Sequence, residues 1–340
     1  MSTNGVRSNN AEPVVVVGAG VSGLTTAICL AEAGARVQVW AAEPPHRPRP
    51  SSRARCGPAF QEPASQTLAW MAQSLRDFQE LAKVPDTGVR LAPVLAVGEL
   101  ANVDELPPQA YLVPDLRRCA SAQLPPGFTH GFLATMPLID MPRYLQYLLD
   151  RLSAAGGEIE IRRVRSLTEA AEAAPIVVNC TGLGARELVG DHTVQPLFGQ
   201  HVVLSNPGLD QVFVEVTEAE EWTCYFPHPQ RVVCGGIRVP GRWDRTPFRM
   251  SPNGFCSDAG RSSRVLPTRR WSRPSRACGL VAPRCGWRSS PWAGRAACTT
   301  MDTAATGSRC PGVVPAKPQG WCSRQQRHAM SHDRKAKAHK

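Results

Sequence analysis

The chain has 340 residues, of which 42% are hydrophobic, and a formal net charge of +11 at pH 7. This length predicts two domains, and the apolar fraction is typical of a soluble globular protein with a large core. No apolar run approaches the roughly 20 residues that span a bilayer, and the first ten residues lack the apolar core of a signal peptide. We therefore expect a cytoplasmic protein without a membrane partner.

The positive charge is concentrated in the last part of the sequence. Residues 250–340 contain 17 Lys or Arg and 3 acidic residues, whereas the first 249 residues contain 22 basic and 25 acidic ones. A nucleic-acid-binding tail is one interpretation, but its basic residues are interspersed with Cys and Trp and form no recognised binding module. We therefore do not expect nucleic acid to be a partner.

The 12 cysteines predict neither a disulfide framework nor a metal site. They are scattered along the chain, and no two are spaced as Cys-x-x-Cys. A cytoplasmic location does not favour disulfides, and a zinc site needs closely spaced ligands. We interpret the cysteines as packed or free thiols and expect no bound metal.

A glycine-rich turn lies near the start of the chain. Val14–Val17 predict a buried strand, and Leu24–Ala33 predict a helix. The residues between them have the spacing Gly-x-Gly-x-x-Gly and are Gly18, Ala19, Gly20, Val21, Ser22 and Gly23. The first glycine allows the tight turn, the second leaves room for a pyrophosphate, and the third lets helix and strand pack closely. The helix N-terminus adds N–H donors and a positive dipole end, so the turn predicts dinucleotide binding.

The residues that follow complete a β-α-β unit. Gly34 predicts the end of the helix, and Val37–Trp40 predict a second strand. Glu43 follows that strand about 20 residues after the third glycine, where an acid binds a ribose hydroxyl. A unit that binds nothing is disfavoured because all four parts occur together, and both a flavin and a nicotinamide dinucleotide remain open.

The middle of the chain alternates helices and strands. Ala41–Pro63 is rich in Pro, Arg and Ser and predicts a loop, in which Ser51 and Ser52 are candidate phosphate donors. The remaining elements are predicted from periodicity and end signals: a helix over Gln66–Leu81, a strand over Val89–Glu99, a helix that begins near Asp140 and ends at Gly156, and a strand over Ile159–Arg163.

The last predicted elements place a second wall beside a cofactor and a sheet after it. Ile176–Cys180 predict a buried strand that runs into Thr181 and Gly182, and an apolar strand with this ending is suited to line a dinucleotide. Between Gln195 and Gly241 several short strands are separated by Pro, Gly and Asn. This pattern predicts one antiparallel sheet, which could cover a substrate.

Five segments that occur in order over about 240 residues carry a resemblance to a known family. They are Val14–Gly23, Pro137–Leu145, Val178–Gly190, Pro196–Gln200 and Gly235–Asp244. In these segments the chain resembles the D-amino-acid oxidase family of flavoproteins, which includes D-aspartate oxidase. Together they are far more specific than the glycine turn alone.

The resemblance implies a fold and a division into domains. The fold class is α/β, with a Rossmann-like FAD-binding domain and a second, α+β domain built on an antiparallel sheet. The expected FAD-binding domain comprises residues 1–55 and 138–190, and the expected substrate domain comprises residues 56–137 and 191–248. Residues 249–340 form a basic tail that we predict to be mostly disordered.

The resemblance also implies a reaction. A neutral D-amino acid would be deaminated oxidatively by hydride transfer from its Cα to FAD. Oxygen would reoxidise the flavin and give hydrogen peroxide, and the imino acid would hydrolyse to a 2-oxo acid and ammonia. Such chemistry needs orientation more than a strong side-chain base. A glycine or D-aspartate oxidase and an inactive product are the alternatives, and a homodimer is left open.

Site residues follow from the resemblance position by position. The glycine turn and Glu43 would bind the ADP half of FAD, and Ser51 and Ser52 match a hydroxyl pair near its phosphates. Val164 matches a residue whose backbone meets adenine, and Thr181 with Gly182 would line the cofactor. Tyr225 matches a sheet tyrosine whose hydroxyl meets the substrate carboxylate. The alternative for Tyr225 is a packing role between strands.

Beyond Phe248 two expected family segments are missing. One is an Arg-Leu strand whose arginine pairs with the substrate carboxylate, and the other is a His-Asn-Tyr-Gly-His-Gly-Gly loop against the flavin. Codons for Cys298–Gly307, read from each third base, permit that loop, and the same offset at Cys285–Trp287 permits Arg-Leu. We therefore hypothesise a frameshift near Arg249, real or from sequencing, which an intact reading frame in the gene would contradict.

Overall fold

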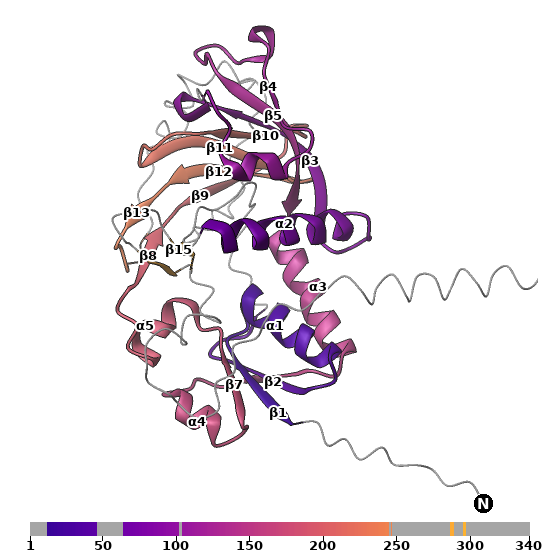
Figure 1. Cartoon of the computed structure of the whole chain (residues 1–340), viewed down its shortest axis with the longest axis vertical. Helices are drawn as coiled ribbons and strands as arrows, with labels where there is room; N and C mark the ends of the chain where they lie inside the picture. The colour runs from indigo at the N-terminus through magenta and orange to yellow at the C-terminus, as the bar shows by residue number, and fades with distance from the viewer. Residues whose placement is uncertain are drawn as a thin grey trace, which may run out of the picture. The chain divides into compact units, whose positions relative to one another are not determined.

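The computed structural model describes residues 12–45, 64–101 and 104–244, Thr246, and two short strands, Gly286–Arg288 and Arg295–Ala296. These residues form two units (Figure 1). The first comprises residues 12–45 and 148–181, and the second comprises residues 64–147 and 182–244 with the two short strands. Among the helices of these ranges, none is long and apolar enough to cross a membrane.

The first unit is built on a four-stranded parallel sheet in the order β6-β2-β1-β7. Its strands are β1 (Pro13–Val17), β2 (Arg36–Ala41), β6 (Glu158–Ile161) and β7 (Ile176–Asn179). Helix α1 (Val21–Glu32) connects β1 to β2, and α4 (Leu167–Ala171) connects β6 to β7. Val15, Val17 and Trp40 pack against Ala170 of α4 on one face of the sheet. This is the predicted Rossmann-like arrangement.

The second unit is built on a seven-stranded sheet in the order β4-β5-β3-β10-β11-β12-β9. The strands are β3 (Val89–Val97), β4 (Arg117–Arg118), β5 (Gly131–Ile139), β9 (His201–Ser205), β10 (Val212–Glu215), β11 (Glu221–Pro227) and β12 (Arg231–Ile237). All neighbours are antiparallel except β3 and β10, which are parallel. The predicted α+β fold class is confirmed, with this one parallel pairing as a difference.

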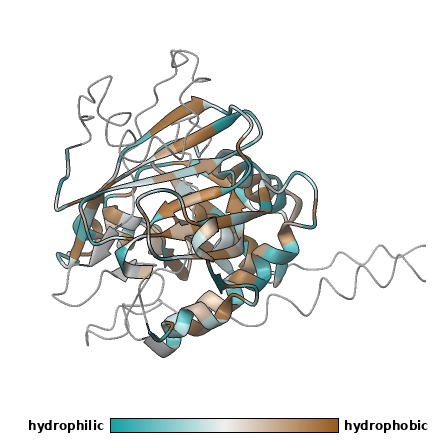
Figure 2. Ribbon diagram, turned by 90° about the horizontal axis from the view of Figure 1, so that it is seen from above, coloured by the Kyte–Doolittle hydropathy of each residue, from teal (hydrophilic) through white to brown (hydrophobic). Residues whose placement is uncertain are grey.

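The two faces of this sheet carry separate apolar clusters, because successive side chains of a strand point to opposite faces. Cys224 and Phe226 belong to one cluster with Val233. Tyr225 belongs to the other with Phe213. Figure 2 shows hydrophobic residues concentrated in the strands and hydrophilic residues in the connecting turns.

One helix packs on β3 and β5 of this sheet, and another follows β5 in the chain. Helix α2 (Ala64–Leu81) contacts β3 and β5, and its Phe78 packs edge-to-face on Tyr144 with ring centroids 5.7 Å apart. Tyr144 lies in α3 (Met141–Ala154), and the boundary between the units falls inside this helix, after Tyr147. Shorter helical segments are η1 (Glu99–Ala101), η2 (Pro108–Leu112), η3 (Ser121–Gln123), η4 (Gly182–Gly184) and α5 (Ala185–Leu188).

A third, small sheet has the order β13-β8-β14-β15. Its strands are β8 (Val194–Phe198), β13 (Val239–Pro240), β14 (Gly286–Arg288) and β15 (Arg295–Ala296), all antiparallel. The basic tail therefore contains two short strands. The other residues of the range 249–340, which we predicted to be mostly disordered, lie outside the described part of the chain.

The division into units differs from the expected domain boundaries. Residues 138–147 lie in the second unit because β5 pairs with β3 as far as Ile139, and because Tyr144 packs on Phe78. Residues 182–190 also lie in the second unit. The assignment of one unit to the cofactor and the other to the substrate stays a prediction.

Candidate cofactor and substrate site

The glycine turn follows β1 directly and has the conformation that dinucleotide binding needs. Gly18 has a φ of 113°, which favours glycine, and a Cβ there would overlap the carbonyl oxygen of Cys180. A Cβ at Gly23 would overlap the carbonyl oxygen of Gly18. Gly18 and Gly23 are therefore required for the close packing of β1, α1 and β7.

Gly20 differs from the other two glycines because space is open beside it. It is the exposed N-cap residue of α1, with φ −79° and ψ −178°, and a Cβ there would have no heavy atom of the described residues within 4 Å. The N-cap glycine has no side chain that could cap the helix, and no acidic residue lies in the first turn. A helix N-terminus that follows a glycine turn in this way fits a pyrophosphate.

The acid predicted to bind a ribose lies just past β2. Glu43 is two residues beyond Ala41, the last residue of β2, and is half-buried. β2 is the neighbour of β1 in the sheet, so Glu43 and the glycine turn both follow carboxyl ends of adjacent parallel strands. This edge of a parallel sheet is where ligands bind.

Asn179 is a candidate site residue that sequence reasoning did not single out. It ends β7, beside Val17 of β1, and is 7% exposed. Its Oδ1 accepts hydrogen bonds from the backbone N–H and the hydroxyl of Thr181, at 3.2 and 2.7 Å. Because the backbone N–H can only donate, the Asn179 amide is fixed with Nδ2 pointing elsewhere. Nδ2 is buried without a partner among the described residues, which fits an acceptor supplied by a bound group.

The other predicted cofactor residues lie in different places. Val164 lies in the turn after β6, is partly buried, and packs against the apolar cluster that contains Trp40 and Ala170. Thr181 ends the first unit, and Gly182, with a φ of 58°, begins the second. Ser51 and Ser52 lie outside the described residues.

Tyr225, the predicted substrate-binding residue, is packed in the sheet of the second unit. The residue is 6% exposed, and its ring stacks on Phe213, with centroids 5.3 Å apart and planes 13° apart. Burial raises its pKa to about 12, with a smaller contribution from Cys234. The hydroxyl is therefore protonated at neutral pH and can donate a hydrogen bond.

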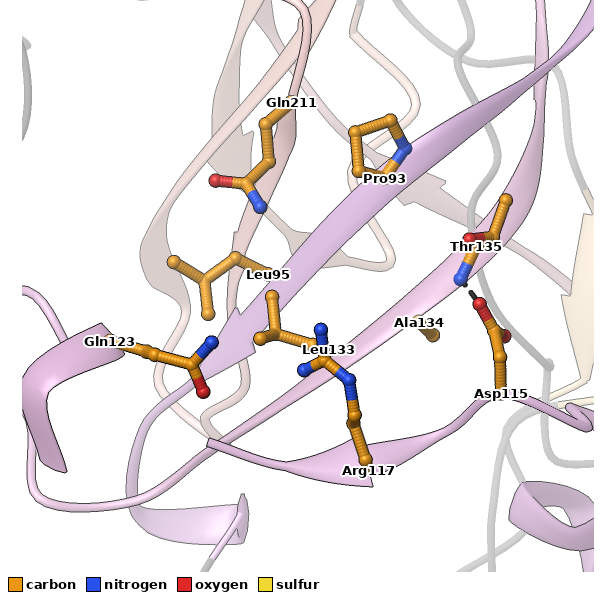
Figure 3. A pocket seen from close by; sticks show the side chains of 9 residues that line it. All are labelled: Pro93, Leu95, Asp115, Arg117, Gln123, Leu133, Ala134, Thr135 and Gln211. Carbon is orange, nitrogen blue, oxygen red and sulfur yellow. Dashed lines mark hydrogen bonds between the residues drawn. The ribbon is translucent and has the colours of Figure 1, made fainter. Parts of the chain in front are cut away.

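A cavity of about 390 Å³ lies on the same face of this sheet as Tyr225 (Figure 3). Leu95 and Leu133 form part of its apolar floor, and Arg117 and Asp115 lie at its rim. The Asp115 carboxylate accepts a hydrogen bond from the backbone N–H of Thr135 at 3.0 Å. Burial opposes ionisation of Asp115, but hydrogen bonds from Thr135 outweigh it and lower the pKa of the carboxyl group.

A second cavity, of about 310 Å³, lies beside His228 and the first residues of α3. His228 is 3% exposed, and its Nδ1 is 3.9 Å from the Asp140 carboxylate, which also binds Arg231 at 2.7 Å. Burial lowers the pKa of His228 to about 4. The Asp140 carboxylate partly opposes this shift, whereas the positive charges of Arg231 and Arg90 add to it. The imidazole is therefore neutral at pH 7.

The parallel sheet, the glycine turn and the open space at Gly20 define a dinucleotide-binding protein of the Rossmann type. A sequence model of the family described as FAD dependent oxidoreductase matches residues 13–315. The match extends beyond residues 14–248, on which the sequence-based resemblance was founded. The chain belongs to this family, and it is an oxidoreductase that uses FAD.

Curated relatives extend the comparison. A D-amino-acid oxidase of Rubrobacter xylanophilus is 38% identical over 279 residues, which is 80% of this chain and 85% of the relative. A D-amino-acid oxidase of Streptomyces coelicolor is 44% identical over 69% of this chain and 72% of the relative. Human D-aspartate oxidase is 28% identical over 69% of this chain and 71% of the relative.

Solved structures agree in fold. L-proline dehydrogenase from P. horikoshii has a TM-score of 0.57 at 14% identity and covers 83% of this chain and 82% of its own. Glycine oxidase from Bacillus cereus has a TM-score of 0.54 at 14% identity and covers 82% of this chain and 83% of its own. At this identity the similarity concerns the fold alone.

Proposed function

We propose that the protein is a D-amino-acid oxidase that converts a neutral D-amino acid to a 2-oxo acid and ammonia, with oxygen reduced to hydrogen peroxide. The observation that carries the proposal is the similarity to two bacterial D-amino-acid oxidases, at 38% and 44% identity over 85% and 72% of their lengths. The glycine turn and the open space at Gly20 support the cofactor that this reaction needs.

FAD, when bound, supplies the acceptor for the hydride that leaves the substrate Cα. The role of the chain is to bind and orient. The N–H groups at the start of α1 bind the pyrophosphate, the Glu43 carboxylate accepts a hydrogen bond from a ribose hydroxyl, and Thr181 lines the cofactor. The neutral hydroxyl of Tyr225 donates to the substrate carboxylate, which favours an anionic carboxylate over an uncharged group.

A D-aspartate oxidase is the second candidate, because human D-aspartate oxidase is also similar over 69% of this chain. Selective oxidation of an acidic D-amino acid needs a second cationic group near the substrate side chain. The relative rates with D-alanine and D-aspartate decide between the two candidates.

The absorption spectrum of the purified 340-residue chain tests the proposal. With oxygen excluded, D-alanine should bleach the flavin bands, and L-alanine is the matched control. Readmitted oxygen should restore the bands and yield one peroxide for each 2-oxo acid. Flavin bands that neither D-alanine nor D-aspartate bleaches would contradict a D-amino-acid oxidase. Absence of flavin bands would instead indicate an inactive product.

A further inference from the structure

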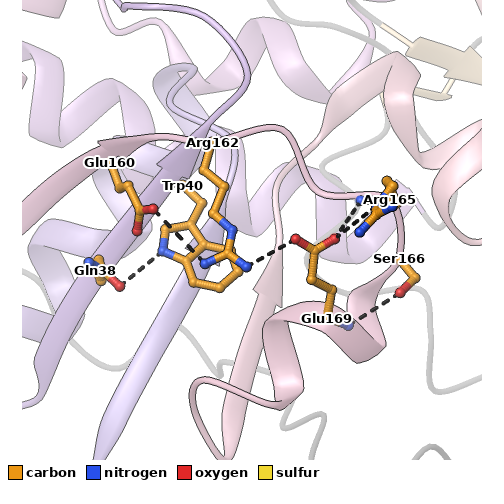
Figure 4. Close-up of polar contacts among 7 residues, drawn as sticks. All are labelled: Gln38, Trp40, Glu160, Arg162, Arg165, Ser166 and Glu169. Atoms are coloured by element: carbon orange, nitrogen blue, oxygen red, sulfur yellow. Dashed lines mark hydrogen bonds and ion pairs between the residues drawn. The ribbon is translucent and has the colours of Figure 1, made fainter.

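The turn of residues 162–166, which joins β6 to α4, is anchored to the neighbouring strand β2 (Figure 4). The backbone N–H of Arg162 donates to the carbonyl oxygen of Ala41 at 2.8 Å, one residue past the last β2–β6 pair. The Arg162 guanidinium lies over the Trp40 ring, 4.0 Å from its centroid, and Trp40 is only 1% exposed. The start of the turn therefore rests on a buried aromatic ring.

Glu169 of α4 holds the same turn from the other side (Figure 4). One carboxylate oxygen accepts from Nη2 of Arg162 and the other from the backbone N–H of Arg165, both at 3.0 Å. The backbone N–H of Glu169 in turn donates to Oγ of the N-cap residue Ser166 at 3.2 Å. The hydrogen bond from the Arg165 N–H, followed by that from Arg162, lowers the pKa of Glu169, so the carboxylate stays ionised.

The turn lies at the edge of the sheet where the adenosine half of a dinucleotide binds. The glycine turn follows β1, Glu43 follows β2, and the turn of residues 162–166 follows β6, the next parallel strand in the sheet. Ligands of such sheets bind at the carboxyl ends of the strands, and the acid after the second strand binds the ribose of the adenosine. The base attached to that ribose therefore lies toward β6 or over β2.

We propose that Glu169 is a positioning residue for FAD, which through Arg162 and Arg165 fixes the backbone of residues 162–165 against which the adenine lies. Ordering a free residue costs conformational entropy. A turn that is already held in the free protein does not incur this cost when the cofactor binds. The inference rests on FAD as cofactor and does not depend on which amino acid is oxidised.

The test compares Glu169→Gln with Glu172→Gln in the full chain freed of FAD. Glutamine keeps the shape of Glu169 but loses its charge, and it offers one acceptor atom where the carboxylate offers two. Glu172 is the exposed C-cap residue of the same helix, so the control makes the same charge change outside the network. Binding of ADP and of FAD is measured by calorimetry. ADP is the probe because it contains the adenosine half and no flavin.

We expect Glu169→Gln to weaken the binding of ADP and of FAD by the same factor, roughly tenfold or more. Glu172→Gln should leave both affinities within about twofold of the wild type. Arg162→Ala should have a similar effect, and the double variant should be no weaker than the worse single variant, because both residues act through one turn. An unchanged ADP affinity in Glu169→Gln, or equal losses in both glutamine variants, would overturn the proposal.

Hydrogen exchange keeps the proposal testable if Glu169→Gln does not fold. In the wild-type chain without FAD, the amide of Arg165 should already be protected, because it donates to Glu169, and so should the amide of Arg162, which donates to Ala41. Ser166→Ala removes only the hydrogen bond to the Glu169 N–H and should weaken ADP in the same direction by a smaller factor. Rapid exchange of the Arg165 amide until ADP is added would show that the cofactor, and not Glu169, orders the turn.

Discussion

Gly20→Ala should separate cofactor binding from folding. The φ of −79° suits alanine, and the added methyl group meets no heavy atom within 4 Å in the part of the chain that the structure describes. A Gly→Ala change at a compatible position stabilises by about 0.4–1 kcal/mol through the unfolded state. Alanine is a poorer N-cap than glycine, which costs up to about 1 kcal/mol. These effects oppose each other, so the free energy of unfolding without FAD should change by less than about 1 kcal/mol.

FAD binding should respond much more strongly to the same substitution. The methyl group would occupy the open space at the N-terminus of α1, where the pyrophosphate approaches the backbone N–H groups. A hydrogen bond to a charged group contributes about 1.5–3 kcal/mol. Loss of one such bond therefore weakens FAD by roughly 10- to 100-fold.

The assay pairs denaturant unfolding without FAD with a flavin fluorescence titration. Gly23→Ala is the matched comparison, because its Cβ would overlap the carbonyl oxygen of Gly18. That variant should lose stability as well as FAD binding. If Gly20→Ala binds FAD with the wild-type affinity, the pyrophosphate does not lie at this turn. If it unfolds in the absence of FAD, the reasoning about open space is wrong.

Three further predictions concern the two units separately. Because the pKa of His228 is lowered to about 4, the unfolded chain binds more protons than the folded chain below about pH 6.5. The free energy of unfolding of the wild type should therefore fall by about 2 kcal/mol from pH 7 to pH 5. Denaturant curves at both pH values should show a smaller fall in His228→Gln. Tyr225→Phe should raise the KM for D-alanine by a factor that corresponds to about 1 kcal/mol, and an unchanged KM would leave Tyr225 a packing residue. Asn179→Ala removes the acceptor of the Thr181 N–H and should lower the free energy of unfolding by about 1–3 kcal/mol, whereas Thr181→Val should lower it by only about 1 kcal/mol. Equal decreases for the two variants in urea unfolding would contradict the assigned contacts.

The first β-α-β unit was predictable because its signals are local. The valine run, the three glycines and the helix end at Gly34 each occupy consecutive residues, and the structure places β1, α1 and β2 there. The strands β5 and β8 were not predicted, and both contain a proline, Pro137 or Pro196. Proline alone does not explain this, because β3 was predicted although it contains Pro93. The parallel pairing of β3 with β10 joins distant segments and has no local signal.

The site was predictable only where its residues belong to a spaced motif. The glycines and Glu43 have fixed positions relative to the strands, and so the sequence located them. Asn179 could have been noted as a polar residue at the end of an apolar strand, but its bonds to Thr181 depend on the turn after β7. The network of Glu169 brings together three segments, and Trp40 in β2 reads in sequence as an ordinary core residue.

The hydrogen bond between Asp115 and Thr135 has a consequence for self-association. β4 pairs with β5 only at Phe132 and Leu133, and no other strand among the described residues pairs with this edge of β5. The next N–H along this edge belongs to Thr135 and is bound by Asp115, and two residues further Pro137 has no N–H to offer. Unpaired edges invite strand addition and aggregation. At Thr135 and Pro137 this edge therefore offers carbonyl acceptors but no available N–H donor, which makes it a poor template for an added strand.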